Sequence, residues 1–127
     1  MRIDSSGNVL VTNPAGLGYG TGSGGTVTQA TSKSTAVTLN KPTGQITMNN
    51  AALGAGSSVS FNFINSLLAA TDSLVIQPNY AVNSQSYTAR VTFCGAGGAY
   101  INVTNLSGGS LSEAVTLSFA IIKGATS

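Results

Sequence analysis

The chain has 127 residues and a formal net charge of +2, and only 6% of its residues are charged, about a quarter of the usual share. Apolar residues make up an ordinary 42%, so we expect one folded domain with a buried core rather than a disordered chain. So small a charge, without clustered Lys and Arg, excludes the basic patch of a nucleic-acid-binding protein. We expect the cations to be isolated, solvated charges: Lys33, Lys41, Arg90 and Lys123.

Residues 1–25 are predicted to form an N-terminal arm with a glycine-rich hinge. The strand-like piece Val9–Val11 precedes the glycine-rich run of residues 16–25, where backbone freedom is greatest. The opening residues lack the apolar segment of a signal peptide, and no apolar run is long enough to span a membrane, so we expect synthesis in the cytoplasm without membrane insertion. The apolar residues of the arm are candidates for self-association: Ile3, Val9, Leu10 and Val11.

The run Gly20–Gly25 matches the G-x-G-x-x-G pattern of phosphate-binding loops. A dinucleotide site would require a buried strand before the glycines, a helix after them and an acidic residue about 20 positions later. Here the strand-forming residues 26–29 follow, and position 45 is a glutamine. The pattern therefore favours a hinge, and no cofactor is expected.

From Thr26 onward, β-branched and aromatic residues alternate with small polar ones, which is typical of half-buried strands. The turn spacing predicts an all-β domain over residues 26–127: an antiparallel, jelly-roll-like β-sandwich of about eight strands. The expected strands are 26–29, 35–39, 45–48, 58–63, 74–77, 86–93, 101–103 and 115–121. Their inward-facing residues are predicted to be Val59, Phe61, Phe63, Tyr87, Ala89, Val91, Phe93, Ile101, Val103, Val115, Leu117, Phe119 and Ile121.

Two turns carry their own residue chemistry. Pro42 presets φ and Gly44 permits a positive φ, so residues 40–44 are predicted to join two strands as a short hairpin. The glycines of Gly95–Gly98 are predicted to do the same before Tyr100.

Few residues of this chain could perform catalysis. Histidine is absent, and the acids are Asp4, Asp72 and Glu113, so a glycosidase-type carboxylate pair would require Asp72 and Glu113 to meet across the fold. Their surroundings favour a turn and a local cap instead. The single Cys94 is expected to point away from Phe93, either outward or into a subunit contact. Because Arg90 is its one basic neighbour, it is expected to be a small packed thiol rather than a nucleophile. We therefore predict no enzyme activity and no zinc site. Binding of a calcium ion by a carboxylate and loop carbonyls is left as an alternative, although the sequence contains no EF-hand loop.

Tyrosines are the aromatic residues best suited to bind a ligand at the surface. Tyr80 and Tyr100 are candidate exposed contacts, within the predicted loops 77–86 and 95–100, and Tyr87 is expected in the core. These two loops are where a glycan would bind in the alternative function given below.

Residues 1–9, MRIDSSGNV, resemble a preamble found in many tailed-bacteriophage fibre proteins. The segments GGTVTQ (24–29), STAVTLNK (34–41), GQITM (44–48) and the end GSLSEAV…FAIIKG (109–124) resemble small phage and prophage structural proteins. The resemblance covers nearly the whole chain but assigns no binding residue.

The resemblance implies a non-enzymatic virion protein on the outer surface of the particle. We predict a capsid decoration, or cement, protein that forms a homotrimer and contacts the major capsid protein, with residues 1–25 lying across neighbouring subunits. The alternative is the tip of a tail fibre or spike, an adhesin that binds a host surface glycan.

Overall fold

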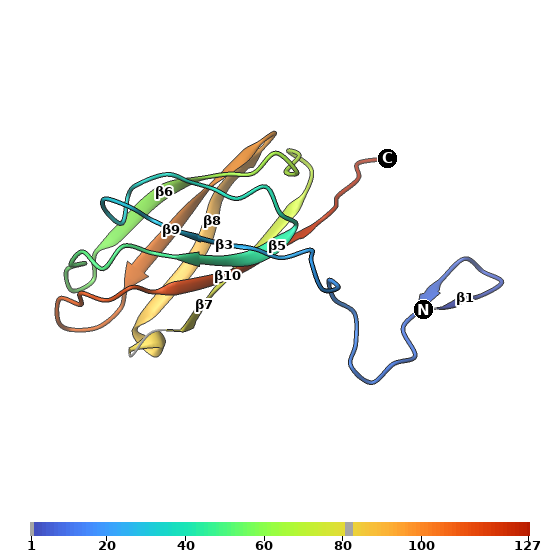
Figure 1. Ribbon diagram of the computed structural model, residues 1–127, viewed down its shortest axis with the longest axis horizontal. Coiled ribbons are helices and arrows are strands. Elements are labelled where there is room, and N and C mark those ends of the chain that lie inside the picture. The colour runs from blue at the N-terminus through green and yellow to red at the C-terminus, as the bar shows by residue number, and fades with distance from the viewer. Residues whose placement is uncertain (1, 81–82) are drawn as a thin grey trace.

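The structure is a computed structural model that describes residues 2–80 and 83–127, and its strands form two facing four-stranded sheets and a separate two-stranded hairpin (Figure 1). The strands are β1 (Arg2–Ile3), β2 (Val9–Leu10), β3 (Thr26–Thr28), β4 (Val37–Thr38), β5 (Thr43–Thr47), β6 (Ser58–Ile64), β7 (Ser73–Tyr80), β8 (Tyr87–Gly95), β9 (Gly98–Asn105) and β10 (Thr116–Ile122). The helical structure of the described residues is one 3₁₀ turn, η1 (Ser84–Ser86).

Each large sheet is built around a late strand of the chain. The β10 sheet has the order β3-β5-β10-β7, and the β9 sheet has the order β4-β6-β9-β8. Pairing is antiparallel except at two edges, where the short strands β3 and β4 lie parallel to β5 and β6. Short edge strands leave few unpaired backbone groups for another chain to extend. The predicted all-β sandwich with eight strands is confirmed, while the jelly-roll connectivity and the domain division at residue 25 stay predictions.

The core lies between the two sheets and follows the period-two pattern. Because alternate side chains of a strand point to opposite faces, β6 and β9 direct apolar residues inward toward those of β10. Phe63 of β6 meets Phe119 of β10 edge to face, with ring centroids 4.8 Å apart, so one aromatic pair joins the sheets. The expected core positions Phe61, Phe63, Tyr87, Ile101, Val103, Val115, Leu117, Phe119 and Ile121 are buried as predicted.

The chain changes sheets at residues 40–44, so the predicted hairpin is wrong. β4 belongs to the β9 sheet and β5 to the β10 sheet, so this turn crosses the sandwich. The residues of the turn make the chain reverse direction, but they do not determine which sheet the next strand joins. That depends on which face of the next strand is buried. The second predicted hairpin is confirmed: Gly95 pairs with Gly98, and Gly97 has a φ of +80° that suits glycine.

Buried amides hold the loops at the ends of the sandwich. Gln29 donates from Nε2 to the carbonyl oxygens of Lys33 and Thr35, at 3.0 and 2.8 Å. Asn105 donates from Nδ2 to the carbonyl oxygens of Leu53 and Gly109, both at 2.8 Å. Each bond satisfies a backbone carbonyl of a loop, two of them in buried and two in part-buried surroundings, where an unpaired carbonyl is costly.

Residues 2–25 precede the sandwich and differ from it in structure. β1 and β2 form a small hairpin that stands clear of the two large sheets in Figure 1. The Asp4 carboxylate accepts hydrogen bonds from the side chain and backbone of Asn8, which hold the pKa of Asp4 below its usual value. The run Gly20–Gly25 leads directly into β3, and no helix begins there.

Candidate functional site

A β-bulge in β8 turns Phe93 to the outside of the sandwich. Val91 pairs with Ile101, but the next pair is Phe93 with Tyr100, so Thr92 is an extra residue and the alternation shifts by one. The prediction that Phe93 is a core residue is therefore wrong: 59% of it is exposed. Cys94 takes the inward direction instead.

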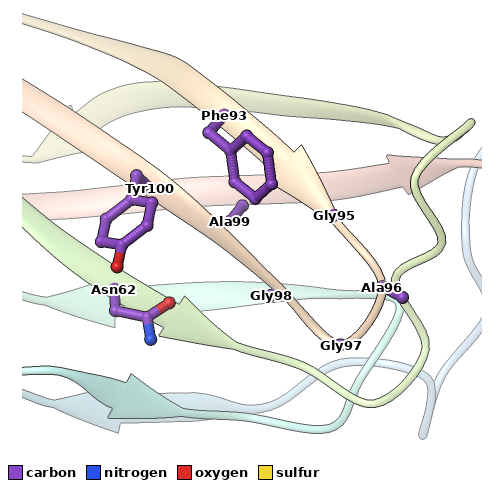
Figure 2. Close-up of a pocket in the computed structure, with 8 residues that line it drawn as sticks. All are labelled: Asn62, Phe93, Gly95, Ala96, Gly97, Gly98, Ala99 and Tyr100. Atoms are coloured by element: carbon purple, nitrogen blue, oxygen red, sulfur yellow. The ribbon is translucent and has the colours of Figure 1, made fainter.

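The bulge creates a shallow pocket on the outer face of the β9 sheet, which we call the Phe93–Tyr100 pocket. Its volume is about 290 Å³, and it is lined by Asn62, Phe93, Tyr100 and the hairpin residues Gly95–Ala99. The rings of Phe93 and Tyr100 lie with centroids 6.2 Å apart and planes inclined at 52°. Figure 2 shows both rings and the Asn62 side chain, with the Tyr100 hydroxyl directed toward Asn62.

Glycines form the floor of this pocket. A Cβ atom on Gly95 would lie 2.8 Å from Cε1 of Phe93, so the ring can rest over the hairpin only because residue 95 has no side chain. A Cβ atom on Gly98 would lie 3.2 Å from the Phe63 carbonyl oxygen. The depression therefore depends on bare backbone at the start and end of the hairpin.

A second, more apolar hollow lies at the end of β10, and we call it the β10 groove. Its volume is about 450 Å³, and residues 17–19 line it together with Ala120–Lys123. The Tyr19 hydroxyl donates to the Ile121 carbonyl oxygen, which holds the end of the N-terminal segment beside the strand. Leu17 is 86% exposed and Ile122 59%, so the groove presents bare apolar surface.

The sequence candidates for self-association lie in or beside the β1–β2 hairpin. Ile3, Val9 and Val11 are exposed and Leu10 is half-buried. Tyr100, the candidate surface contact, is 49% exposed, but it lies in β9 rather than in a loop. Tyr80 is the last residue of β7, and its side chain lies outside the described part of the structure, as do residues 81–82 of the predicted 77–86 loop.

Asp72 connects the start of β7 to the end of β10. Its carboxylate accepts hydrogen bonds from Lys123 Nζ at 2.5 Å, from the Ala69 N–H at 2.9 Å and from the Gly124 N–H at 3.1 Å. The bond from Lys123 contributes most to lowering the Asp72 pKa to about 2. All three bonds are strongest when the carboxylate is ionised, so this acid serves the fold.

Glu113 lies at the opposite end of β10, three residues before the strand begins at Thr116. It accepts hydrogen bonds from the Tyr87 hydroxyl at 3.1 Å and from Asn83. Burial of Tyr87, together with this carboxylate, raises the pKa of Tyr87 to about 12. The length of β10, roughly 20 Å at the usual rise per residue, separates Glu113 from Asp72. A glycosidase requires its two carboxyl groups within roughly 10 Å, so the fold does not assemble that pair.

Lys33 is buried, so the prediction of a solvated charge is wrong at this position. The residue is 4% exposed, and its Nζ donates to the carbonyl oxygens of Asn49 and, at 2.7 Å, of Glu113. Removal from water lowers its pKa. Lys123 is also engaged, in the ion pair with Asp72, whereas Arg90 is exposed as expected.

Cys94 is a half-buried free thiol packed against the core. Its Sγ lies 3.8 Å from the Ala69 carbonyl oxygen, and burial raises its pKa. A raised pKa keeps the thiol protonated and unreactive. The prediction of a packed thiol agrees with this placement.

Comparison of the chain with protein-family models, with curated proteins and with solved structures found no match. Within residues 2–80 and 83–127, no three Cys, Asp or Glu side chains gather as a metal site would require. No helix in the same residues is long and apolar enough to cross a membrane.

Proposed function

We propose that this chain is a non-enzymatic structural protein of a bacteriophage particle, which self-associates on the outer surface as a capsid decoration, or cement, protein. The phage assignment is supported by the resemblance of residues 1–9 and of the segments between 24 and 124 to small phage proteins. The non-enzymatic character is supported by the hydrogen bonds of Asp72 and Glu113, which use both acids within the fold.

The β10 groove is the observation that carries self-association. Its apolar surface lies beside the N-terminal segment, and the β1–β2 hairpin stands clear of the sandwich with Ile3 and Val9 exposed. We place the hairpin of one copy in the β10 groove of the next. Two different surfaces then meet at each contact. Such a head-to-tail contact forms a ring when the rotation between copies closes, and we propose a ring of three copies.

Cementing requires no reaction, because a protein that binds only the assembled shell stabilises it by mass action. In this proposal the trimer sits on the major capsid protein and bridges neighbouring subunits.

A receptor-binding tip of a tail fibre is the second candidate, and the Phe93–Tyr100 pocket is the observation that favours it. Two exposed aromatic rings beside an amide are typical of a ligand-binding surface. They are not expected on a surface that only bridges capsid subunits.

Copy number on purified particles separates the two candidates. Gel densitometry against the major capsid protein should give a copy number comparable to that of the shell subunits, and deletion should make particles less stable to heat without changing adsorption. A copy number comparable to that of a tail fibre, with loss of adsorption on deletion, would contradict decoration and support the fibre tip.

A further inference from the structure

We propose that the Phe93–Tyr100 pocket is a binding site for an uncharged hexopyranose sugar. The inference concerns the outer face of the β9 sheet and does not depend on whether the chain decorates a capsid or ends a fibre. It rests on four properties of the pocket: its two aromatic walls, its uncommitted polar groups, its glycine floor and the absence of charge among its lining residues.

The aromatic walls are unusual because both rings lie on the outer face of a sheet. Phe93 and Tyr100 are 59% and 49% exposed, and the bulge at Thr92 is what brings Phe93 to this face. The face of an aromatic ring carries partial negative charge, which attracts the C–H groups on the flat side of a pyranose ring. With centroids 6.2 Å apart and planes inclined at 52°, the rings form an angled platform rather than a closed stack.

The polar groups beside the rings have no partner in the described part of the chain. The side-chain amide of Asn62 and the hydroxyl of Tyr100 make no hydrogen bond to another described residue, and Figure 2 shows them on the same side of the pocket. An amide offers a donor and an acceptor side by side, which match two adjacent sugar hydroxyls. A ligand site typically combines an apolar wall with a few polar groups of this kind.

The floor of the pocket is kept open by glycine. Side chains at Gly95 or Gly98 would meet the Phe93 ring or the Asn62 amide oxygen, at 2.8 and 3.4 Å from their Cβ atoms. A substitution there would therefore fill the pocket or displace its walls. These glycines also belong to a tight hairpin, so the site is built on two paired strands rather than on a free loop.

The surroundings favour a sugar over another protein surface. Beyond the two rings and Ile64, which is 40% exposed at the end of β6, this face of the sheet carries hydroxyls and amides that bond one another. Asn102 donates to Ser60 at 3.0 Å, and the hydroxyls of Ser58 and Thr104 lie 2.6 Å apart. A protein interface is most apolar at its centre, whereas here the apolar side chains lie at the hairpin end of the sheet and the rest of this face is polar. The residues that line the pocket are all uncharged. The nearest cation along the paired strands is Arg90 of β8, which lies opposite Asn102 of β9. The ligand is therefore neutral.

The test is a titration of the isotope-labelled full chain with the methyl glycosides of glucose, galactose, mannose and N-acetylglucosamine, followed by amide NMR. At least one sugar should cause saturable shifts confined to Asn62, Phe93 and the 95–100 hairpin, with a dissociation constant on the order of 1 mM. Absence of such shifts with all four sugars would overturn the proposal.

Variants then locate the site. Phe93→Ala and Tyr100→Ala should each weaken binding about tenfold, the loss expected when one stacking ring is removed. Asn62→Leu should weaken binding while both rings remain. Val75→Ala, which shortens an exposed side chain in β7 of the other sheet, should leave binding unchanged. Because Phe93 and Tyr100 are exposed, these variants should keep the wild-type amide spectrum outside the pocket.

Two results identify the competing explanations. If the methyl glycoside of glucuronic acid binds more tightly than all four neutral sugars, and added salt or Arg90→Ala removes that advantage, the site prefers an anionic ligand and the assignment to a neutral sugar is wrong. If Phe93→Ala instead dissociates an oligomer in sedimentation velocity and sugars cause no shifts, the pocket is a subunit contact.

Discussion

The two sheets of the sandwich share one core but present different outer surfaces. The β9 sheet carries a polar face with two exposed rings at its hairpin end, whereas the β10 sheet presents an apolar groove beside residues 17–19. The difference has two local causes. In the β9 sheet, an extra residue in β8 turns Phe93 outward, and beside the β10 sheet, Tyr19 fixes the N-terminal segment. One scaffold can therefore offer two contacts of different chemistry, one polar and aromatic, one apolar.

The largest loss of stability is expected at the aromatic pair that joins the two sheets, where the side chains face the core rather than solvent. Phe63→Ala should lower the free energy of unfolding by about 3–5 kcal/mol, because Phe63 is fully buried against Phe119 and its removal leaves a cavity. Phe93→Ala is the matched control and should change stability by less than about 0.5 kcal/mol. Urea denaturation measures both, and similar losses for the two variants would contradict the bulge in β8.

A smaller loss is expected where β3 approaches β5 in the β10 sheet. A Cβ atom on Gly44 would lie 2.3 Å from the Gly25 carbonyl oxygen, and a backbone atom cannot move away cheaply. Gly44→Ala should therefore cost about 1–3 kcal/mol. Gly108→Ala, where a Cβ atom meets nothing within 4 Å, should have little effect. Equal unfolding midpoints in urea for the two variants would disprove this approach of β3 to β5.

The link between β7 and β10 is expected to depend on pH. The pKa of Asp72 is lowered from 3.8 to about 2, so its contribution to stability is complete above about pH 4 and disappears as the pH falls toward 2. Asp72→Asn should lower the melting temperature at pH 7, and the gap to wild type should narrow between pH 4 and pH 2. Asp4→Asn, in the separate hairpin, should not shift this transition. A constant gap across this range would show that the Asp72 charge is not the stabilising group.

The sequence predicts the parts of the fold that depend on strict alternation. Val59, Phe61 and Phe63 face one way because a regular strand has a period of two, and the same rule places Leu117 and Phe119. Phe93 was mispredicted because the extra residue Thr92 shifts the phase, and nothing in the residue types around Thr92 announces a bulge.

The positions that sequence reasoning missed depend on distant partners. Lys33 is buried because carbonyl groups from Asn49 and Glu113 surround its ammonium, and these residues are 16 and 80 positions away. The Phe93–Tyr100 pocket likewise needs Asn62 from β6. Tyr100 could be proposed as a surface contact from sequence, but its companions could not, since they meet only when β6, β8 and β9 pair.

The measurement that tests the self-association proposal most directly is the mass of the purified protein in solution by sedimentation velocity. We predict an oligomer, a trimer in the proposed ring, that dissociates when the β10 groove is made polar by Leu17→Ser with Ile122→Ser. Leu106→Ser, an exposed leucine outside the groove, should leave the mass unchanged. A wild-type protein that stays monomeric at all concentrations, or an oligomer indifferent to the groove substitutions, would contradict the account.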